Sequence, residues 1–347
     1  MAVAQELCKV APPIKVFGVL QTQWAQQILK TGVELDLFSQ LAKEPLTAAQ
    51  LAAKIGCDVR ATQLLADSLA ALGFLICEGK SNADGKYKLT EDSRHYLVKD
   101  SDYFFGDYVL ARDQVADAWK QLTAVIKSGK PIKEVNTDKG AEEFFPKLAA
   151  AIFPINFSTA QMLADLLKVN ELPAGARVLD LASGSAVWSI PLAAANSKLQ
   201  VDSLDFPPVL KMQKHFTGKH GVASQYKDLE GSWRDVKLDA DSYDLIILGH
   251  ILHSEGQKAS EELIKACFAA LKKGGRLVIA EYMKHEEKPG PEFASMFAVN
   301  MLLMTTEGCV FSFEQLADMT KRVGFQSVER PLLPHWDELS PIVVAHK

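Results

Sequence analysis

The feature that most constrains the fold is the stretch RVLDLASGSAVWSI at residues 177–190. It begins as an apolar run typical of a buried strand, passes through five small residues at 182–186, and continues into an alanine-rich segment typical of a helix. Small residues between a strand and a helix let a ligand approach the backbone and the helix N-terminus. The stretch therefore predicts the first strand and turn of a ligand-binding sheet.

The pattern of residues 174–347 supports this prediction, because short apolar runs alternate with helical segments. The predicted strands are, in chain order, RVLDLA, LQVDSLD, SQYKDLE, YDLIILG and RLVIAEY. Such alternation indicates an α/β fold with a doubly wound, Rossmann-like parallel sheet. The last two runs, FQSVERPLL and PIVVAHK, are joined by the polar loop PHWDELS without a helix, so we expect an antiparallel pair at the sheet edge.

The first part of the chain has a different pattern. Residues 1–111 predict three helices followed by a β-hairpin around SNADG, which together form a mainly α winged-helix domain. The predicted second helix of the pair carries few cations, and the whole chain has a net charge of −5, so we expect no nucleic-acid partner. Residues 112–173 predict an aromatic-rich helical bridge that contributes to the substrate cavity.

The cysteine pattern and the lengths of the apolar stretches indicate the cellular location. The five cysteines are widely spaced and include no C-x-x-C pair, which disfavours structural zinc and a disulfide framework. We therefore expect a cytoplasmic protein. The beginning of the sequence does not resemble a signal peptide, and no apolar stretch approaches the roughly 20 residues of a membrane span, so we expect no membrane partner.

The ligand of the sheet is predicted to contain a nucleoside. Asp205, in LDFPPV, follows the second strand, where a carboxylate can accept both hydroxyls of a ribose. A dinucleotide fits poorly, because the first turn supplies only Gly184 and the acid Asp180 lies close to it. S-adenosylmethionine fits better, since it has no phosphate and carries a cationic sulfonium.

At these motifs the chain resembles the class I methyltransferases of the plant caffeate and hydroxyindole O-methyltransferase type, including their bacterial relatives. ELDLFSQLAKEPLTAAQLAAKIG and LLADSLAALGFL look like the dimerisation domain of that family, and LDLASGSAVW resembles its glycine-rich motif. Where the family usually has glycines, this chain has Ala182, Ser183 and Ala186. The resemblance implies a homodimer that uses S-adenosyl-L-methionine to methylate a small molecule.

The resemblance also implies a set of cofactor-binding residues. YKDLEGSW falls where the family has G-D-M-F against adenine, so Asp228 matches the acid, Leu229 would lie against the ring, and Lys227 replaces the glycine. The full cofactor set expected here is Asp180, Ala182, Gly184, Asp205, Phe206, Asp228, Leu229 and Gly249.

For catalysis the family uses a histidine after the fourth strand as general base. The match here is ILHSE, with His253 as the base and Ser254 in place of the usual acid, and Glu281 matches the acid that orients the base. A neutral imidazole can take a proton from a hydroxyl as the methyl group leaves sulfur. The expected substrate-binding residues are Phe153, Asn156, Phe157, His250 and Met304.

One departure from the family leaves the accepting atom open. Val310 stands where the family has a second acid, and Glu307 is near but not aligned. O-methylation is the first hypothesis, S- or C-methylation is the alternative, and a non-catalytic winged-helix regulator is a third. His250, His253 and Glu281 together could suggest a metal, but no further ligand has matching spacing, so we expect none.

Overall fold

The computed structural model describes residues 11–80, 84–132, 134, 138–333 and 340–347. The chain divides into two compact units, Met1–Arg112 and Asp113–Lys347. The segment expected as a helical bridge is therefore contained, apart from Arg112, in the second unit. None of the helices in the described ranges has the length and apolar character needed to cross a membrane.

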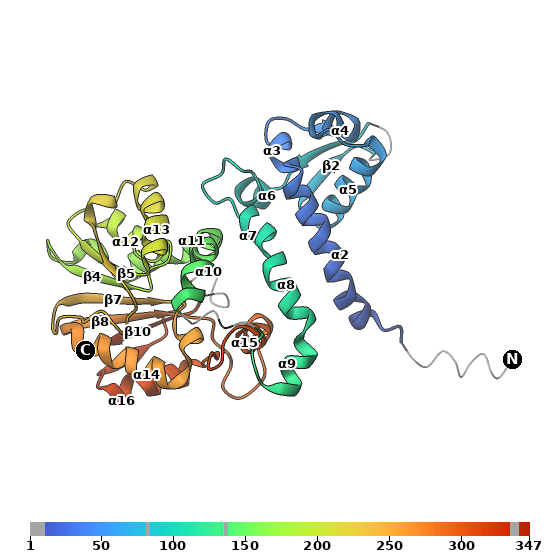
Figure 1. Ribbon diagram of the computed structural model, residues 1–347. Coiled ribbons are helices and arrows are strands. Elements are labelled where there is room, and N and C mark those ends of the chain that lie inside the picture. Colours follow the sequence, from blue (N-terminus) through green and yellow to red (C-terminus); the bar gives the residue numbers. More distant parts are fainter. Residues whose placement is uncertain (1–10, 81–83, 133, 135–137, 334–339) are drawn as a thin grey trace. The chain divides into compact units, whose positions relative to one another are not determined.

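The first unit contains the predicted helices and hairpin. Its sheet has the strand order β1-β3-β2, and β2 pairs antiparallel with β3. Its elements are α2 (Ile14–Glu34), α3 (Leu37–Leu41), β1 (Leu46–Thr47), α4 (Ala48–Ile55), α5 (Val59–Ala71), β2 (Leu75–Glu78), β3 (Lys86–Leu89), α6 (Glu91–Tyr96) and α7 (Gly106–Ala111) (Figure 1). Most of the turn SNADG lies outside the described residues.

Local chemistry explains where these helices begin and end. Thr47 starts α4 with a capping box, in which its hydroxyl accepts the N–H of Gln50 and the Gln50 side chain accepts the N–H of Thr47. The Asp58 carboxylate caps α5 by accepting the N–H of Ala61. The run QTQWAQQILKTGVELDLFSQLA at residues 21–42 has apolar residues at helical spacing, but it is divided into α2 and α3, because Asp36 adopts a left-handed conformation with φ 53°.

The second unit is built on the predicted doubly wound sheet. Its strand order is β6-β5-β4-β7-β8-β10-β9, in which the first five strands are parallel and β10 runs antiparallel to both neighbours. The strands are β4 (Arg177–Leu181), β5 (Gln200–Asp205), β6 (Tyr226–Glu230), β7 (Tyr243–Gly249), β8 (Leu271–Ala280), β9 (Ser327–Glu329) and β10 (Ile342–His346). The antiparallel pair at the edge is thus confirmed.

Helices cover both faces of this sheet, with α14 and α16 on one side and α12 and α13 on the other (Figure 1). The helices of the unit are α8 (Asp113–Lys120), α9 (Leu122–Ser128), α10 (Asp138–Ala151), α11 (Phe153–Leu166), α12 (Ile190–Ala195), α13 (Pro207–Lys219), α14 (Leu252–Ala270), α15 (Glu292–Met304) and α16 (Phe313–Val323), with short 3-10 turns at Val169–Glu171 and Ala223–Gln225. Burial on both faces accounts for the continuous apolar runs of the central strands.

The sheet places the site through its strand order. The chain moves outward from β4 to β5 and β6 and then returns to β7 on the other side of β4. Ligands of such sheets bind outside the carboxyl ends of the strands at this reversal. The carboxyl ends of β4, β5, β7 and β8 therefore define the region in which a site is to be sought.

Candidate active site

Two strand ends bring together residues that lie far apart in the sequence. Gly249 at the end of β7 is paired with Ala280 at the end of β8. His250 follows the first and Glu281 follows the second, and the His250 N–H donates to the Ala280 carbonyl at 2.8 Å. The register of two buried strands therefore fixes the backbone positions of this histidine and this glutamate.

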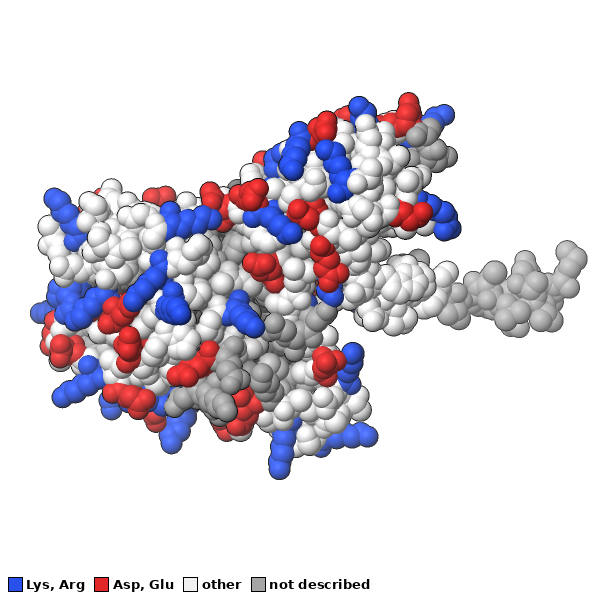
Figure 2. Space-filling view, turned by 45° about the horizontal axis from the view of Figure 1, so that its top comes forward, with Lys and Arg blue, Asp and Glu red and all other residues white. Residues whose placement is uncertain are grey.

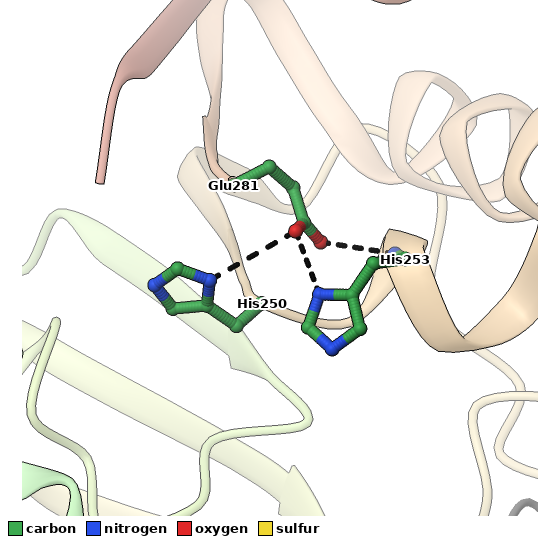
Figure 3. A group of neighbouring side chains, drawn as sticks. All are labelled: His250, His253 and Glu281. Atoms are coloured by element: carbon green, nitrogen blue, oxygen red, sulfur yellow. Dashed lines mark hydrogen bonds and ion pairs between the residues drawn. The ribbon is translucent and has the colours of Figure 1, made fainter. Parts of the chain in front are cut away.

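His253 is held against Glu281 by two contacts. Its backbone N–H donates to Glu281 Oε1 at 3.1 Å, and its Nδ1 lies 2.7 Å from Glu281 Oε2 (Figure 3). The ring is therefore oriented by the carboxylate, and Nε2 points away from Glu281 (Figure 3). A neutral His253 that donates from Nδ1 has its lone pair on Nε2, where it can accept a proton.

Glu281 is ionised although it is buried. Its side chain is 1% exposed. Burial raises the pKa of this carboxyl group, but the two neighbouring histidines, His253 above all, outweigh burial and lower it to about 2. An anionic carboxylate on Nδ1 of His253 stabilises the imidazolium that forms when Nε2 takes a proton.

His250 lies on the other side of the same carboxylate. Its Nδ1 is 3.8 Å from Glu281 Oε2, and its Nε2 is 3.3 Å from Ser340 Oγ. Ser340 donates its hydroxyl to Asn156 Oδ1 at 2.9 Å, which ties α11 to the segment before β10. Burial is the main cause that lowers the pKa of His250, so this ring is neutral near pH 7.

Aromatic rings surround the two histidines. The ring centroid of Tyr282 is 4.4 Å from that of His250, and the Phe297 ring meets His253 edge-on at 4.9 Å. Phe293 stacks on Phe297 at 6.0 Å, and Trp188 lies 5.7 Å from His250. Tyr282 follows β8 whereas Phe293 and Phe297 lie on α15, so no pattern within a single element indicated that these rings would gather at the base.

The turn after β4 and the end of β5 form the cofactor side of the site. Asp205 Oδ2 accepts the N–H of Gly184 at 2.9 Å, and Oδ1 accepts the N–H of Phe206 at 2.8 Å. Burial raises the pKa of Asp205 to about 6, while these two backbone N–H groups oppose that shift. Each oxygen retains a lone pair for a further donor, so the carboxylate fits the hydroxyls of a ribose.

The turn itself has an unusual backbone. Ala182, Gly184 and Ala186 have φ values of 55°, 56° and 58°, in the left-handed region that alanine rarely adopts. Two of these positions carry only a methyl group, and Ala186 is buried. Two alanines thus adopt a conformation here that glycine adopts more readily.

The other expected cofactor residues have mixed surroundings. Asp180 is buried, accepts the Ser189 hydroxyl, and has its pKa raised to about 7 by burial. Asp228 pairs with Lys214 at 2.8 Å, and Leu229 packs on the apolar core between the sheet and α14. Gly249 faces the Trp188 indole so closely that a Cβ there would lie 2.3 Å from its Cδ1.

The five expected substrate residues do not form one group. Asn156 and His250 meet through Ser340, as described above. Phe153 and Phe157 stack on each other at 4.9 Å, and Phe153 stacks on Phe216 of α13 at 4.5 Å, so these rings fill the contact between α11 and α13. Met304 is buried beside Val125 and Leu303. Their role in substrate binding stays a prediction.

The segment that lacks the second acid runs directly past the base. The Cys309 N–H donates to the His253 carbonyl at 2.8 Å, and Val310 is buried. Glu307 is exposed, and among the described residues it makes no hydrogen bond or ion pair with His253. Glu281 is therefore the carboxylate that contacts the base in the described part of the chain.

His250, His253 and Glu281 have the chemistry of metal ligands. The nitrogen atoms of His250 and His253 and a carboxylate oxygen of Glu281 all lie within 4.8 Å of one another. On the face shown in Figure 2, basic and acidic side chains are interspersed.

Comparisons with known proteins agree with this geometry. Residues 133–326 match the model of the O-methyltransferase domain, and residues 17–99 match that of the O-methyltransferase dimerisation domain. A 3-hydroxy-5-methyl-1-naphthoate 3-O-methyltransferase of Streptomyces sahachiroi is 26% identical over 81% of each chain, and a bovine acetylserotonin O-methyltransferase is 25% identical over 80% of this chain and 83% of its own.

Solved structures show the same fold. A putative O-methyltransferase of Nostoc punctiforme superposes with a TM-score of 0.84 and 25% identity, covering 98% of this chain and 100% of its own. Human N-acetylserotonin methyltransferase, solved in complex with S-adenosylmethionine, superposes with a TM-score of 0.83 and 19% identity, covering 98% and 99%.

Proposed function

Because the chain belongs to the O-methyltransferase family, we propose that His253 is the general base of its reaction and that Glu281 orients it. The protein is an S-adenosylmethionine-dependent O-methyltransferase that acts on a small molecule. The observation that carries the assignment is the 2.7 Å contact between His253 Nδ1 and Glu281 Oε2, beyond the carboxyl ends of β7 and β8.

In this proposal the residues around the first turn bind the cofactor, which supplies an electrophilic methyl group when bound. Asp205 accepts the ribose hydroxyls, and the turn at 182–186 lets the ligand approach the backbone. Asp228 and Leu229 are proposed for the adenine, and Asp180, Phe206 and Gly249 complete the site. Transfer is an in-line displacement that depends mostly on proximity and alignment.

His253 then removes the proton that the acceptor hydroxyl loses as its oxygen bonds to the methyl carbon. The proton moves to Nε2, and the positive charge that develops on the ring is stabilised by ionised Glu281. The rings of Tyr282 and Phe297 pack against the base and limit the access of water to it.

We propose a hydroxylated aromatic compound as the acceptor. The support is the group of flat side chains beside the base, in which Phe293 and Phe297 are parallel and Tyr282 meets both edge-on. Offset and edge-on ring contacts favour a planar guest. Related enzymes are named for a hydroxynaphthoate and for acetylserotonin, both of which carry aromatic rings.

The test is methyl transfer from isotope-labelled S-adenosylmethionine to a panel that includes 3-hydroxy-1-naphthoate, N-acetylserotonin and simple thiols. His253→Ala is expected to lower turnover by roughly 10²–10⁴-fold, the usual contribution of a positioned base. Glu281→Gln keeps the shape of the side chain but removes its charge, and it is also expected to lower turnover. His215→Ala, at an exposed position of α13, is the matched control.

The affinity for S-adenosylhomocysteine should change little in either active-site variant, because the base faces the acceptor. A His253→Ala enzyme within about threefold of wild type would remove His253 from the reaction, since that is far below the effect of a general base. Turnover of thiols but not of phenols would overturn the proposed acceptor.

We also propose that the protein is a homodimer assembled through its first unit. The support is the apolar surface of α2, where large side chains are exposed at Ile14, Val16, Phe17, Val19, Leu20 and Trp24. An exposed apolar surface of this extent is typical of an interface. Cytoplasmic location is supported by Cys57, Cys77, Cys267 and Cys309, all of which are free thiols.

A further inference from the structure

His250 has a buried ring nitrogen that no group in the described chain satisfies. The side chain is 8% exposed, and Nδ1 is inaccessible to solvent and without a hydrogen-bond partner. Most buried polar atoms are paired, so an unpaired one calls for an explanation. Nδ1 points toward Glu281, whose Oε2 is 3.8 Å away (Figure 3).

The other nitrogen of the ring shows which form His250 takes. Ser340 gives its hydroxyl proton to Asn156, so the Ser340 oxygen is free to accept the N–H of His250 Nε2 at 3.3 Å. A neutral imidazole carries one proton, and Nδ1 therefore presents a lone pair. Two electron-rich atoms, this nitrogen and the anionic Glu281 oxygen, thus face each other inside the protein.

We propose that His250, His253 and Glu281 form a binding site for a zinc ion, or for a divalent cation of similar softness. Imidazole nitrogen and carboxylate oxygen are ligands that zinc accepts, whereas magnesium and calcium prefer oxygen alone. The three ligand atoms lie within 4.8 Å of one another. A fourth position remains for water, as in zinc sites with two histidines and a glutamate.

The distances suit such an ion. Zinc–ligand bonds of about 2.0–2.1 Å in a tetrahedron place the ligand atoms about 3.3 Å from one another. The measured separations, 2.7 Å from His253 to Glu281 and 3.8 Å from His250 to Glu281, lie on either side of that value. Small side-chain rotations are enough to equalise them.

The surroundings of His250 resemble those of a metal ligand. Histidines that bind metals usually donate their second ring N–H to a neighbour that fixes the ring and the position of its proton. Ser340 and Asn156, each 1% exposed, are placed to do this for Nε2. The left-handed backbone of His250, with φ 59°, also fixes the direction of the side chain.

Zinc at this position would inhibit the enzyme, a consequence that rests on the proposed role of His253. Neutral His253 now has its proton on Nδ1, between the ring and Glu281. An ion on Nδ1 requires that proton to move to Nε2, so the nitrogen that faces the acceptor becomes a donor. The base can then take no proton until the ion leaves.

Isothermal titration of ZnCl2 into the full-length, chelator-treated protein tests the site without any acceptor. We expect one zinc per chain and no binding of MgCl2. His250→Phe keeps the ring but removes the ligand, and it should weaken zinc binding by at least about 100-fold, whereas Ser340→Ala should weaken it by about 10-fold. His215→Phe, on exposed α13, is the control and should bind zinc as wild type does.

A crystal soaked in zinc should show an anomalous peak between the three side chains. Absence of saturable binding, or unchanged binding in His250→Phe, would overturn the proposal. If that variant is misfolded by circular dichroism, Glu281→Gln replaces it. Zinc should lower turnover and chelator should restore it; zinc bound at the site with full turnover would refute the inhibition. A failure of the proposed function would be seen in a separate measurement, because His253→Ala would then keep nearly wild-type turnover in the absence of metal.

Discussion

Replacing Ala182 by glycine should not destabilise the protein, although alanine-to-glycine changes usually do. Ala182 sits at φ 55°, where an L-residue is about 1–2 kcal/mol less stable than in the right-handed region, and glycine removes that strain. The opposing contribution is entropic: glycine has more conformational freedom in the unfolded chain, which lowers the free energy of unfolding by about 0.5–1 kcal/mol.

The lost methyl group is the remaining contribution. Ala182 is partly buried against the core between the sheet and α14, so about half of the roughly 0.8 kcal/mol of a buried methylene is lost. The three contributions sum to between about 0.4 kcal/mol of destabilisation and about 1 kcal/mol of stabilisation, and the middle of that range is slightly stabilising. Ala194→Gly, at an exposed position of the nearby helix α12, has no strain to relieve and should cost about 0.5–1 kcal/mol.

Thermal unfolding followed by circular dichroism separates the two variants. For a unit of this size, about 1 kcal/mol corresponds to about 2–4 °C in Tm. Ala182→Gly should therefore melt close to or above the wild-type temperature and Ala194→Gly below it. An equal loss of Tm in both variants would refute the argument that the left-handed conformation of Ala182 is strained.

Three further predictions concern cofactor binding, the packing of α14 and the assembly. Asp205 has a pKa raised to about 6, and its ionised form accepts ribose hydroxyls, so affinity for S-adenosylhomocysteine should rise about tenfold between pH 5 and 7.5. Titration calorimetry should find this rise absent in Asp205→Asn; a persisting rise would assign it to another group. Gly256→Ala would place a Cβ 2.5 Å from the Glu307 carbonyl at φ 76°, so it should lower stability by about 2–4 kcal/mol in denaturant unfolding. Trp24→Lys should convert a dimer to monomer in light scattering, and a wild-type monomer at micromolar concentration would contradict the proposed interface.

The sequence was sufficient to predict elements with strong local signals. The strand-turn-helix around residues 177–190, the hairpin of the first unit and the antiparallel end of the sheet each depend on patterns within about ten residues. Elements set by a single unusual residue were missed. Asp36 divides the first long helix through its left-handed backbone, and β1, with two residues, is too short to have a period.

The candidate site was only partly predictable for a different reason. His253 and Glu281 were identified through the family resemblance, and both follow strands whose ends lie side by side. The Ser340 contact to His250 depends on how the segment before β10 packs, and no local pattern indicates it. The Phe153 and Phe157 rings were expected beside the substrate, but an aromatic stripe equally suits the contact with α13 in which they lie.

The position of β10 constrains the order in which the protein can fold during synthesis. β10 spans Ile342–His346, yet it lies between β8 and β9, and the Glu281 N–H donates to the Pro341 carbonyl beside it. A nascent chain that has not reached these residues exposes an open edge on β8 and leaves Glu281 unanchored. The first unit has all its strands by Leu89, so it can fold while the ribosome is still synthesising the second unit. The second unit, in contrast, needs β10 near the end of the chain before its sheet and the position of Glu281 are complete.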